Sequence, residues 1–437
     1  MMYYFIEKVK KSARFFLLWL FAFIAFFSSY SQDDFDQWFE NKALRIDYFL
    51  AGDANTQQFF LNDLREEPFW SGSHFSLIDQ LGFGTHRVMV TELQGGTLIY
   101  SQGFCTLFQE WQTTPEAKYL ARAFEQVTRI PFPRQKVQIS FEFRDRSGVF
   151  TELYKFEVDP SSIFINRRAP KPIPSIKIVD NGHHNQKLDI AFIAEGYTGE
   201  DMDKFKADVK RFADFLFSQP PFSEFADGIN IWAVESVSDG VGPSNPGTGY
   251  WNTTSTQSEF YTFGIDRYLT TTRFHRVMDI AAQVPGDLVY ILVNTSDYGG
   301  GGIYNHFSMV TADHELSGIV FIHEFGHGLA GLGDEYYTSD VAYQDFYPLN
   351  VEPWEPNLTT LVDFQSKWAE LIDKDTPIPT PDTKKFIDKV GVFEGGGYIH
   401  KGVYRPFIDC RMKSNEAKSF CPVCQKAIST VIETYIR

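Results

Sequence analysis

Apolar and polar residues alternate along two early stretches of the chain, residues 44–50 and 137–143. Alternation with a period of two is typical of strands that bury one face. Residues 94–97, Gln-Gly-Gly-Thr, have the composition of a turn between two further strand-like runs. The pair Thr114-Pro115 predicts one helix, with Thr as N-cap and Pro at the first helical position. The pattern therefore predicts an N-terminal β-sandwich domain over residues 32–165.

A proline-rich stretch follows, and residues 166–175 have the composition of a semi-rigid linker. Beyond it the pattern changes to short apolar runs that alternate with helical periodicity, which is α/β organisation. We expect a second domain over residues 176–437. Its predicted elements are strands at 188–194, 229–234 and 288–293 and an amphipathic helix that begins at Thr198 and ends near Phe217.

The first residues have the pattern of a signal peptide. Lys8, Lys10, Lys11 and Arg14 are basic, and residues 15–27 are apolar. Ser29 and Ser31 put small residues at the positions that a signal peptidase reads. We predict a signal peptide over residues 1–31 and export to the periplasm, the cell surface or the medium. An uncleaved anchor is the alternative, but about thirteen apolar residues are short for a span that needs roughly twenty. No later stretch predicts a membrane span.

Composition narrows the function classes. Hydrophobic residues make up 43% of the 437 residues and aromatic residues 16%, which excludes a disordered chain. Lys and Arg total 40 against 56 Asp and Glu, and the formal net charge is −16. With no basic patch visible, the sequence argues against a nucleic-acid partner.

The residues that suggest catalysis are concentrated in one segment, residues 311–335. A predicted strand at 288–293 and a predicted loop at 299–302 come before it. Residues 311–313, Thr-Ala-Asp, are expected to cap a helix that carries His323, Glu324 and His327 in the order H-E-x-x-H. Two histidines four residues apart on a helix face the same way and suit one Zn²⁺. Glu324 beside them is placed to act as general base on a zinc-activated water.

Glycines and acidic residues follow these histidines. Gly326 and Gly328 lie inside the predicted helix, where each costs about 1 kcal/mol relative to Ala. Gly331 and Gly333 end it, and Asp334 and Glu335 come next. A carboxylate there can supply the third ligand that a catalytic zinc site needs. The alternative is a plain helix end followed by solvated acidic residues.

Residues 323–336, which read HEFGHGLAGLGDEY, resemble the signature of the IgA-peptidase family of secreted bacterial metallopeptidases in the metzincin clan. The resemblance implies an α+β protein: an N-terminal β-sandwich, then a metzincin-like α/β zinc peptidase domain with a mixed sheet and an active-site helix. It implies one catalytic Zn²⁺ held by His323, His327 and Asp334, with Met412 in a tight turn beneath the metal.

The spacing departs from the common pattern of the clan, which puts the glycine three and the third ligand six residues after the second histidine. Here Gly331 is four and Asp334 seven residues after His327. Asp334 is therefore the first choice and Glu335 its rival, since both offer hard oxygen ligands. Other candidates for a site built differently are Glu352, Glu355 and His400.

Other features give weaker expectations. The strand-like residues 307–311 are placed to be the sheet edge that pairs with extended substrate, or else an interior strand. Tyr404 is a candidate for hydrogen bonding to an oxyanion, or else an ordinary packed tyrosine. Acidic groups around Asp239 and Asp297 would suit Ca²⁺, although no ligand pattern supports it.

Cys410, Cys421 and Cys424 fall within fifteen residues of one another. In an exported protein this spacing favours one disulfide, from Cys410 to Cys421 or Cys424, with one thiol left over. A zinc site made of these thiols would lack a clear fourth ligand.

The sequence therefore predicts an exported zinc-dependent endopeptidase with a polypeptide substrate, for which the family resemblance implies host immunoglobulin A. Two alternatives remain: a catalytically silent protein that binds a surface protein or glycan, and a zinc amidase acting on non-protein amides.

Overall fold

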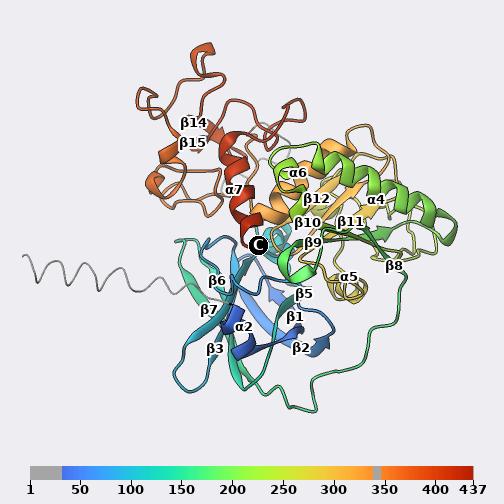
Figure 1. The fold of residues 1–437 in the computed structure, drawn as a ribbon. Helices are drawn as coiled ribbons and strands as arrows, with labels where there is room; N and C mark the ends of the chain where they lie inside the picture. Colours follow the sequence, from blue (N-terminus) through green and yellow to red (C-terminus); the bar gives the residue numbers. More distant parts are fainter. Residues whose placement is uncertain (1–31, 338–345, 437) are drawn as a thin grey trace, which may run out of the picture.

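The computed structural model describes residues 32–337 and 346–436. The predicted signal peptide, residues 1–31, lies outside them. Two antiparallel sheets form the N-terminal part of the described chain, a mixed sheet with helices forms the middle, and a hairpin with a final helix forms the C-terminal part (Figure 1). No helix among the described residues is long and apolar enough to cross a bilayer.

The two N-terminal sheets have the strand orders β2-β1-β5 and β4-β3-β6-β7, and every pairing within them is antiparallel. The two sheets pack face to face. The ring of Phe141 on β6 lies 5.1 Å from that of Tyr48 on β1 and 4.8 Å from that of Phe59 on β2. The elements of this part are α2 (Gln32–Trp38), β1 (Phe39–Gly52), β2 (Gln57–Glu67), β3 (His86–Glu92), β4 (Leu98–Phe104), α3 (Leu107–Gln112), β5 (Arg122–Pro133), β6 (Val137–Arg144) and β7 (Phe150–Val158).

The prediction of a helix that begins at Thr114-Pro115 is wrong. Residues Glu116–Lys118 form a single 3-10 turn, and the α-helix of this region is the preceding α3. The Thr106 hydroxyl caps α3 by accepting the Gln109 N–H at 3.1 Å. The chain cannot stay helical after Pro115, because β5 begins at Arg122 and pairs with β1 along nearly its whole length.

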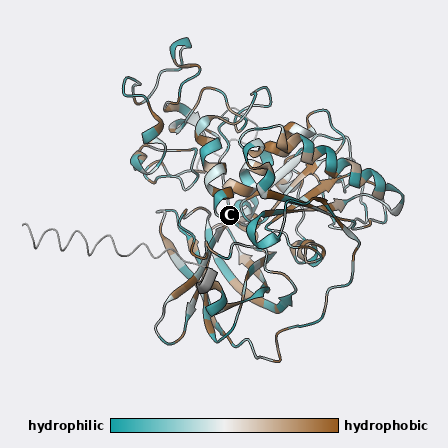
Figure 2. Ribbon diagram, in the orientation of Figure 1, coloured by the Kyte–Doolittle hydropathy of each residue, from teal (hydrophilic) through white to brown (hydrophobic). Residues whose placement is uncertain are grey.

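The middle part is built on a six-stranded sheet of order β12-β13-β11-β9-β10-β8. The inner pairings are parallel, whereas the edge strands β8 and β12 are antiparallel to their neighbours. Its central strands are buried and mostly hydrophobic, and Figure 2 shows them in brown. The elements are β8 (Ser175–Val179), β9 (Leu188–Glu195), α4 (Met202–Phe217), β10 (Ile229–Val234), α5 (Phe274–Ala281), β11 (Leu288–Val293), β12 (Gly300–Ile303), β13 (Phe307–Thr311) and α6 (Ser317–Ala330).

Alternate side chains of β9 and β11 point to two different cores. Ile190 and Phe192 pack in one cluster with α4, α6 and the C-terminal helix α7 (Pro422–Glu433). Ala191 and Ile193 pack in another that contains α5 and the N-terminal sheets. The α+β organisation of the described chain therefore rests on a mixed sheet covered on both faces.

The edge strand of this sheet is not the one that the sequence suggested. Phe307–Thr311 is the interior strand β13, and the edge is β12, Gly300–Ile303, which was expected to be a loop. A side chain at Gly302 would come within 2.4 Å of the Glu324 carbonyl oxygen, so glycine lets β12 lie against α6. The helix α6 itself begins at Ser317, after the residues expected to cap it.

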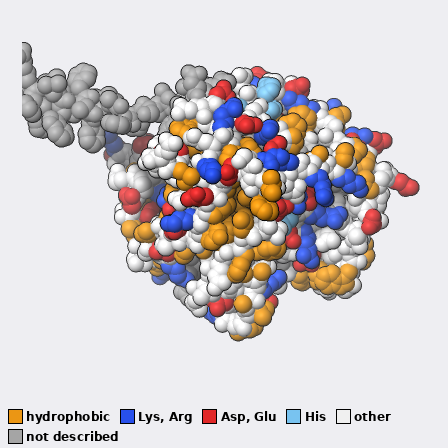
Figure 3. Space-filling view, turned by 90° about the horizontal axis from the view of Figure 1, so that it is seen from below, with side chains coloured by type: hydrophobic (Ala, Val, Ile, Leu, Met, Phe, Trp, Pro, Cys, Tyr) orange, Lys and Arg blue, Asp and Glu red, His pale blue; other side chains and the backbone are white. Residues whose placement is uncertain are grey.

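No α-helix or β-strand of the described chain lies between β7 and β8, where the linker was predicted, and the domain boundaries stay a prediction. The C-terminal part contains the hairpin of β14 (Phe393–Gly396) and β15 (Ile399–Arg405), which precedes α7. On the face that the N-terminal sheets form, acidic and basic side chains are interspersed (Figure 3).

A buried ion-pair network joins the N-terminal sheets to α5. Arg45 on β1 is 1% exposed and binds Asp47 through two hydrogen bonds, at 2.6 and 3.0 Å. Its Nη1 lies 3.4 Å from Glu67 Oε1 and 2.8 Å from Asp279 Oδ1 on α5. The guanidinium therefore neutralises two buried carboxylates and contacts the second part of the chain at the same time.

We expect Arg45→Met to lower the free energy of unfolding by about 3 kcal/mol, because Asp47 and Glu67 would stay buried after losing their shared cation. Arg65 Nε, 3.3 Å from Asp47 Oδ2, would offset part of the loss. Urea denaturation measures this. The control is Lys155→Met, which breaks an exposed pair with Glu152 and should cost at most about 1 kcal/mol. Equal losses in the two variants would contradict the role given to Arg45.

Candidate metal centre

The helix α6 presents His323 and His327 on one face, and close packing explains the glycines between and after them. A methyl group at Gly326 would lie 2.9 Å from Met412 Sδ, and one at Gly328 would lie 2.1 Å from Ser308 Oγ. Both positions exclude side chains because other segments pack directly on the helix.

The chain turns back at the end of α6. Gly331 has φ +60°, a left-handed conformation that glycine adopts without strain. The turn brings Asp334 to the histidines: its Oδ1 lies 3.1 Å from His323 Nε2 and 3.3 Å from His327 Nε2. The two Nε2 atoms are 3.1 Å apart. Three potential ligand atoms therefore form a nearly equilateral triangle.

Backbone carbonyls fix the orientation of both imidazole rings. His323 Nδ1 lies 3.0 Å from the Arg411 carbonyl oxygen, and His327 Nδ1 lies 2.5 Å from that of Leu332. A carbonyl only accepts, so each Nδ1 donates and carries the hydrogen. Each Nε2 of a neutral ring is then an acceptor that faces another acceptor.

The triangle has the size that a metal ion requires. Zinc–nitrogen and zinc–oxygen bonds of about 2.0–2.1 Å in a tetrahedron put ligand atoms about 3.3 Å apart. Asp334 Oδ1 is also buried without a hydrogen-bond donor. A cation between these acceptors would satisfy all of them.

The charge of Asp334 dominates the electrostatics of the triangle. Burial alone would raise the pKa of Asp334 and lower that of His327. Their attraction outweighs burial: the pKa of Asp334 falls well below its usual value and that of His327 rises to about 9. Protons and a metal ion therefore compete for His327 Nε2, and metal affinity is expected to fall as the pH decreases.

Several groups hold the segment that carries Asp334. The Tyr398 hydroxyl donates a short hydrogen bond to Asp334 Oδ2. Asn357, which is fully buried, accepts from Gly333 N–H and donates to the Gly333 carbonyl, both at 2.8 Å. The Gly397 N–H donates to the Asp334 carbonyl at 2.7 Å. The carboxylate is therefore oriented from both sides.

Glu324 lies between the two histidines in sequence and against the edge strand in space. A side chain at Gly300 would come within 3.1 Å of Glu324 Oε1, so the carboxylate lies against β12. Burial raises the pKa of Glu324. A carboxylate with a raised pKa is better suited to accept a proton near neutral pH.

Met412 lies in a tight turn beneath α6. The turn is closed by the Lys413 N–H, which donates to the Cys410 carbonyl at 2.8 Å. Met412 is fully buried, and its backbone oxygen accepts the Glu335 N–H at 2.8 Å. The turn therefore supports the helix from below and, through Arg411, orients His323.

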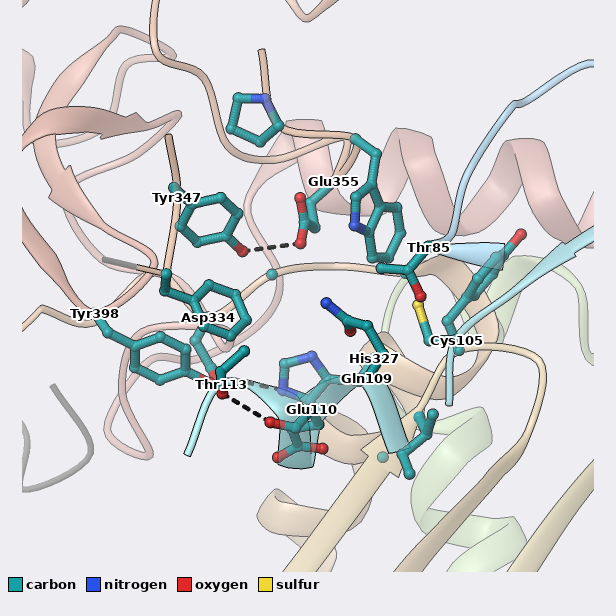
Figure 4. Close-up of a pocket in the computed structure, with 18 of the residues that line it drawn as sticks. Thr85, Cys105, Gln109, Glu110, Thr113, His327, Asp334, Tyr347, Glu355 and Tyr398 are labelled. Carbon is teal, nitrogen blue, oxygen red and sulfur yellow. Dashed lines mark hydrogen bonds and ion pairs between the residues drawn. The ribbon is translucent and has the colours of Figure 1, made fainter. Parts of the chain in front are cut away.

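A large cleft, about 1950 Å³ in volume, opens onto the triangle and is lined by both parts of the chain. From the N-terminal part, α3 brings Glu110 beside His327 and Asp334 (Figure 4). The Tyr268 hydroxyl donates to Glu110 Oε2 at 2.6 Å, and burial raises the pKa of Glu110 to about 7. The N-terminal part thus forms one wall of the cleft.

The rival ligands lie elsewhere. Glu335 points away and accepts from Asn357 Nδ2 at 3.0 Å and from the Cys424 thiol at 3.2 Å. Glu355 accepts the Tyr347 hydroxyl at 2.8 Å, Glu352 accepts the Asp363 N–H at 3.0 Å, and the exposed His400 packs on Tyr337.

The structure separates further candidates from the triangle. Tyr404 is on β15 and does not line the cleft described above. Among the described residues, the two groups of donors close enough for a metal ion include neither Asp239 nor Asp297.

The expected disulfide is not formed in the structure. All four cysteines are free, and Cys410 Sγ lies 3.7 Å from Cys424 Sγ, far beyond the about 2.05 Å of a bond. The three clustered thiols instead surround the carboxyl group of Glu335.

Sequence reasoning missed Glu110 and Asn357, and it missed the contact of Tyr398 with Asp334. Each lies far from the histidines in sequence and carries no spacing pattern, so only the folded chain brings it to the site. The signal for Tyr398 is its place in the turn of the hairpin β14-β15, which faces Asp334 only in the folded chain.

Comparison with known families agrees with this geometry. A family model described as IgA Peptidase M64 matches residues 176–389 and 382–432, and one described as Peptidase M64 N-terminus matches residues 34–155. No curated protein matches the chain. Together the two family models cover the α6 segment, the cleft and the N-terminal sheets, and the chain therefore belongs to the IgA peptidase M64 family.

Proposed function

We propose that the protein is an exported zinc-dependent endopeptidase with His323, His327 and Asp334 as metal ligands and Glu324 as general base. The observation that carries the proposal is the triangle of three acceptors, with sides of 3.1–3.3 Å, at the floor of a large cleft. Membership of a peptidase family supports the same reaction class.

His323, His327 and Asp334 would hold a zinc ion, and that ion would supply Lewis-acid chemistry at the floor of the cleft. Glu324 would accept a proton from the attacking water at its carboxylate and later donate it to the leaving amine. The raised pKa of Glu324 suits both steps. Tyr398 would hold Asp334 through its Oδ2, which leaves Oδ1 for the metal.

We also propose a metzincin-like arrangement for the peptidase domain. Three features support it: a glycine turn that ends α6 and is followed by Asp334, a buried methionine in a tight turn below the helix, and an antiparallel edge strand above it. The edge of β12 is partly covered, because the Leu269 N–H donates to the Gly300 carbonyl at 3.4 Å.

The substrate we propose is a polypeptide. The cleft is large and is lined by residues of both parts of the chain, which suits an extended polypeptide better than a small molecule. The family description names immunoglobulin A, and we propose host immunoglobulin A as the first protein to test. A panel of proteins, short peptides and cell-wall amides separates an endopeptidase from an amidase and from a silent binding protein.

We expect Glu324→Gln to reduce kcat for peptide hydrolysis by about 10²–10⁴-fold while zinc stays bound, because the variant loses a proton acceptor and no ligand. Hydrolysis of casein and zinc content are measured on the same samples. Glu352→Gln changes a cleft carboxylate that hydrogen-bonds Thr360 and Asp363 instead, and it should be fully active. Full activity of Glu324→Gln would refute the general base.

We expect Tyr398→Phe to weaken zinc binding by about 10–100-fold, because it removes the hydroxyl that orients Asp334. Competition with a chromogenic chelator measures the affinity. Tyr404→Phe is the control, since it changes a tyrosine of the same hairpin outside the cleft. An unchanged affinity of Tyr398→Phe would show that Asp334 is not held through this hydroxyl, or is not a ligand.

A further inference from the structure

A second group of potential metal ligands lies behind the first. Its members are the carboxylate of Glu335 and the thiols of Cys410, Cys421 and Cys424, and their ligand atoms all lie within 4.8 Å of one another. Each residue is at most 4% exposed. The group joins three segments: the loop after α6, the turn that contains Met412, and the start of α7.

Two distances between these atoms are close to those around a tetrahedral ion. Zinc–sulfur bonds of about 2.3 Å put two thiolates about 3.8 Å apart. Cys410 Sγ and Cys424 Sγ are 3.7 Å apart, and Cys424 Sγ is 3.2 Å from Glu335 Oε1. The spacing of Cys421 and Cys424 is the C-x2-C of many structural zinc sites.

Glu335 offers a fourth potential ligand, which the sequence could not identify. Its side chain is fully buried, and its Oε2 has no hydrogen-bond donor. A buried carboxylate oxygen without a partner is costly, and a cation removes that cost. A single disulfide among the three thiols would leave this oxygen and one thiol unsatisfied.

Groups with positive or partly positive charge lie around the four potential ligands. Cys421 is the N-cap of α7, where the helix dipole stabilises negative charge. Its backbone N–H donates to Cys410 Sγ at 3.2 Å. The buried guanidinium of Arg405 acts electrostatically on Glu335, and that of Arg411 acts on Cys410. Three thiolates and a carboxylate carry four negative charges, of which a divalent ion neutralises two. The positive groups offset part of the remaining negative charge.

We propose that Glu335, Cys410, Cys421 and Cys424 bind a second, structural Zn²⁺. Three thiolates select zinc over hard cations such as Ca²⁺ and Mg²⁺. The ion would tie Glu335, the neighbour of Asp334, to the turn whose Arg411 carbonyl orients His323. The proposal does not depend on peptidase activity, since it concerns residues outside the cleft.

The test is the number of zinc ions per chain, measured by plasma mass spectrometry after loading with Zn²⁺ and desalting. Wild type should hold two. The double variant Cys421→Ser/Cys424→Ser should hold one, as should His323→Ala/His327→Ala, and Cys105→Ser, which changes the fourth cysteine, should hold two. Equal zinc in wild type and the cysteine double variant would overturn the second site.

A spectrum covers the case in which the cysteine variant fails to fold. His323→Ala/His327→Ala keeps all the thiols, and loading it with Co²⁺ should give sulfur-to-cobalt charge-transfer absorption in the near ultraviolet. Absence of that absorption, or a Cys410 disulfide found by non-reducing peptide mapping of wild type, would refute the proposal. If the histidine variant still cleaves peptides with its zinc unchanged, the peptidase centre fails while the thiol site stands.

Discussion

The orientation of two imidazole rings by backbone carbonyls is the constraint on which the rest of the site depends. His323 and His327 can face Asp334 with free Nε2 atoms only because Arg411 and Leu332 accept from their Nδ1 atoms. Those two carbonyls belong to segments that other contacts must hold still. The glycine turn after α6, the clamp by Asn357 and the tight turn around Met412 all serve that requirement.

Much of the fold could be predicted, because local patterns decide it. The strands β10, β11 and β13 have the predicted bounds, and α4 begins after the predicted Thr198 cap. Buried parallel strands are short apolar runs that sequence shows plainly. The errors fall where distant contacts decide the structure. β5 pairs with β1 and leaves Thr114-Pro115 room for one turn only, and β12 is a strand of glycines because α6 lies against it.

The same distinction applies to the site. The histidines, Glu324 and the glycines lie in one continuous segment, so their spacing on a helix could be interpreted without the fold. Glu110 and Tyr398 come from segments more than sixty residues away on either side, and no periodicity relates them to the histidines. The sequence shows that the mid-helix glycines are costly, but only the structure shows the reason, which is the packing of Met412 and Ser308 against them.

The choice between Asp334 and Glu335 shows what a single inserted residue means physically. The two neighbours point to opposite sides of the chain: Asp334 toward the histidines and Glu335 toward the thiols. The Glu335 N–H donates to Met412 and the Gly397 N–H donates to the Asp334 carbonyl, so the segment lies between two partners that fix its rotation. Shifting it by one residue would exchange the positions of the two carboxylates. The pair of acidic residues is therefore not redundant, because Asp334 faces two imidazole rings whereas Glu335 faces three thiols and the Asn357 amide.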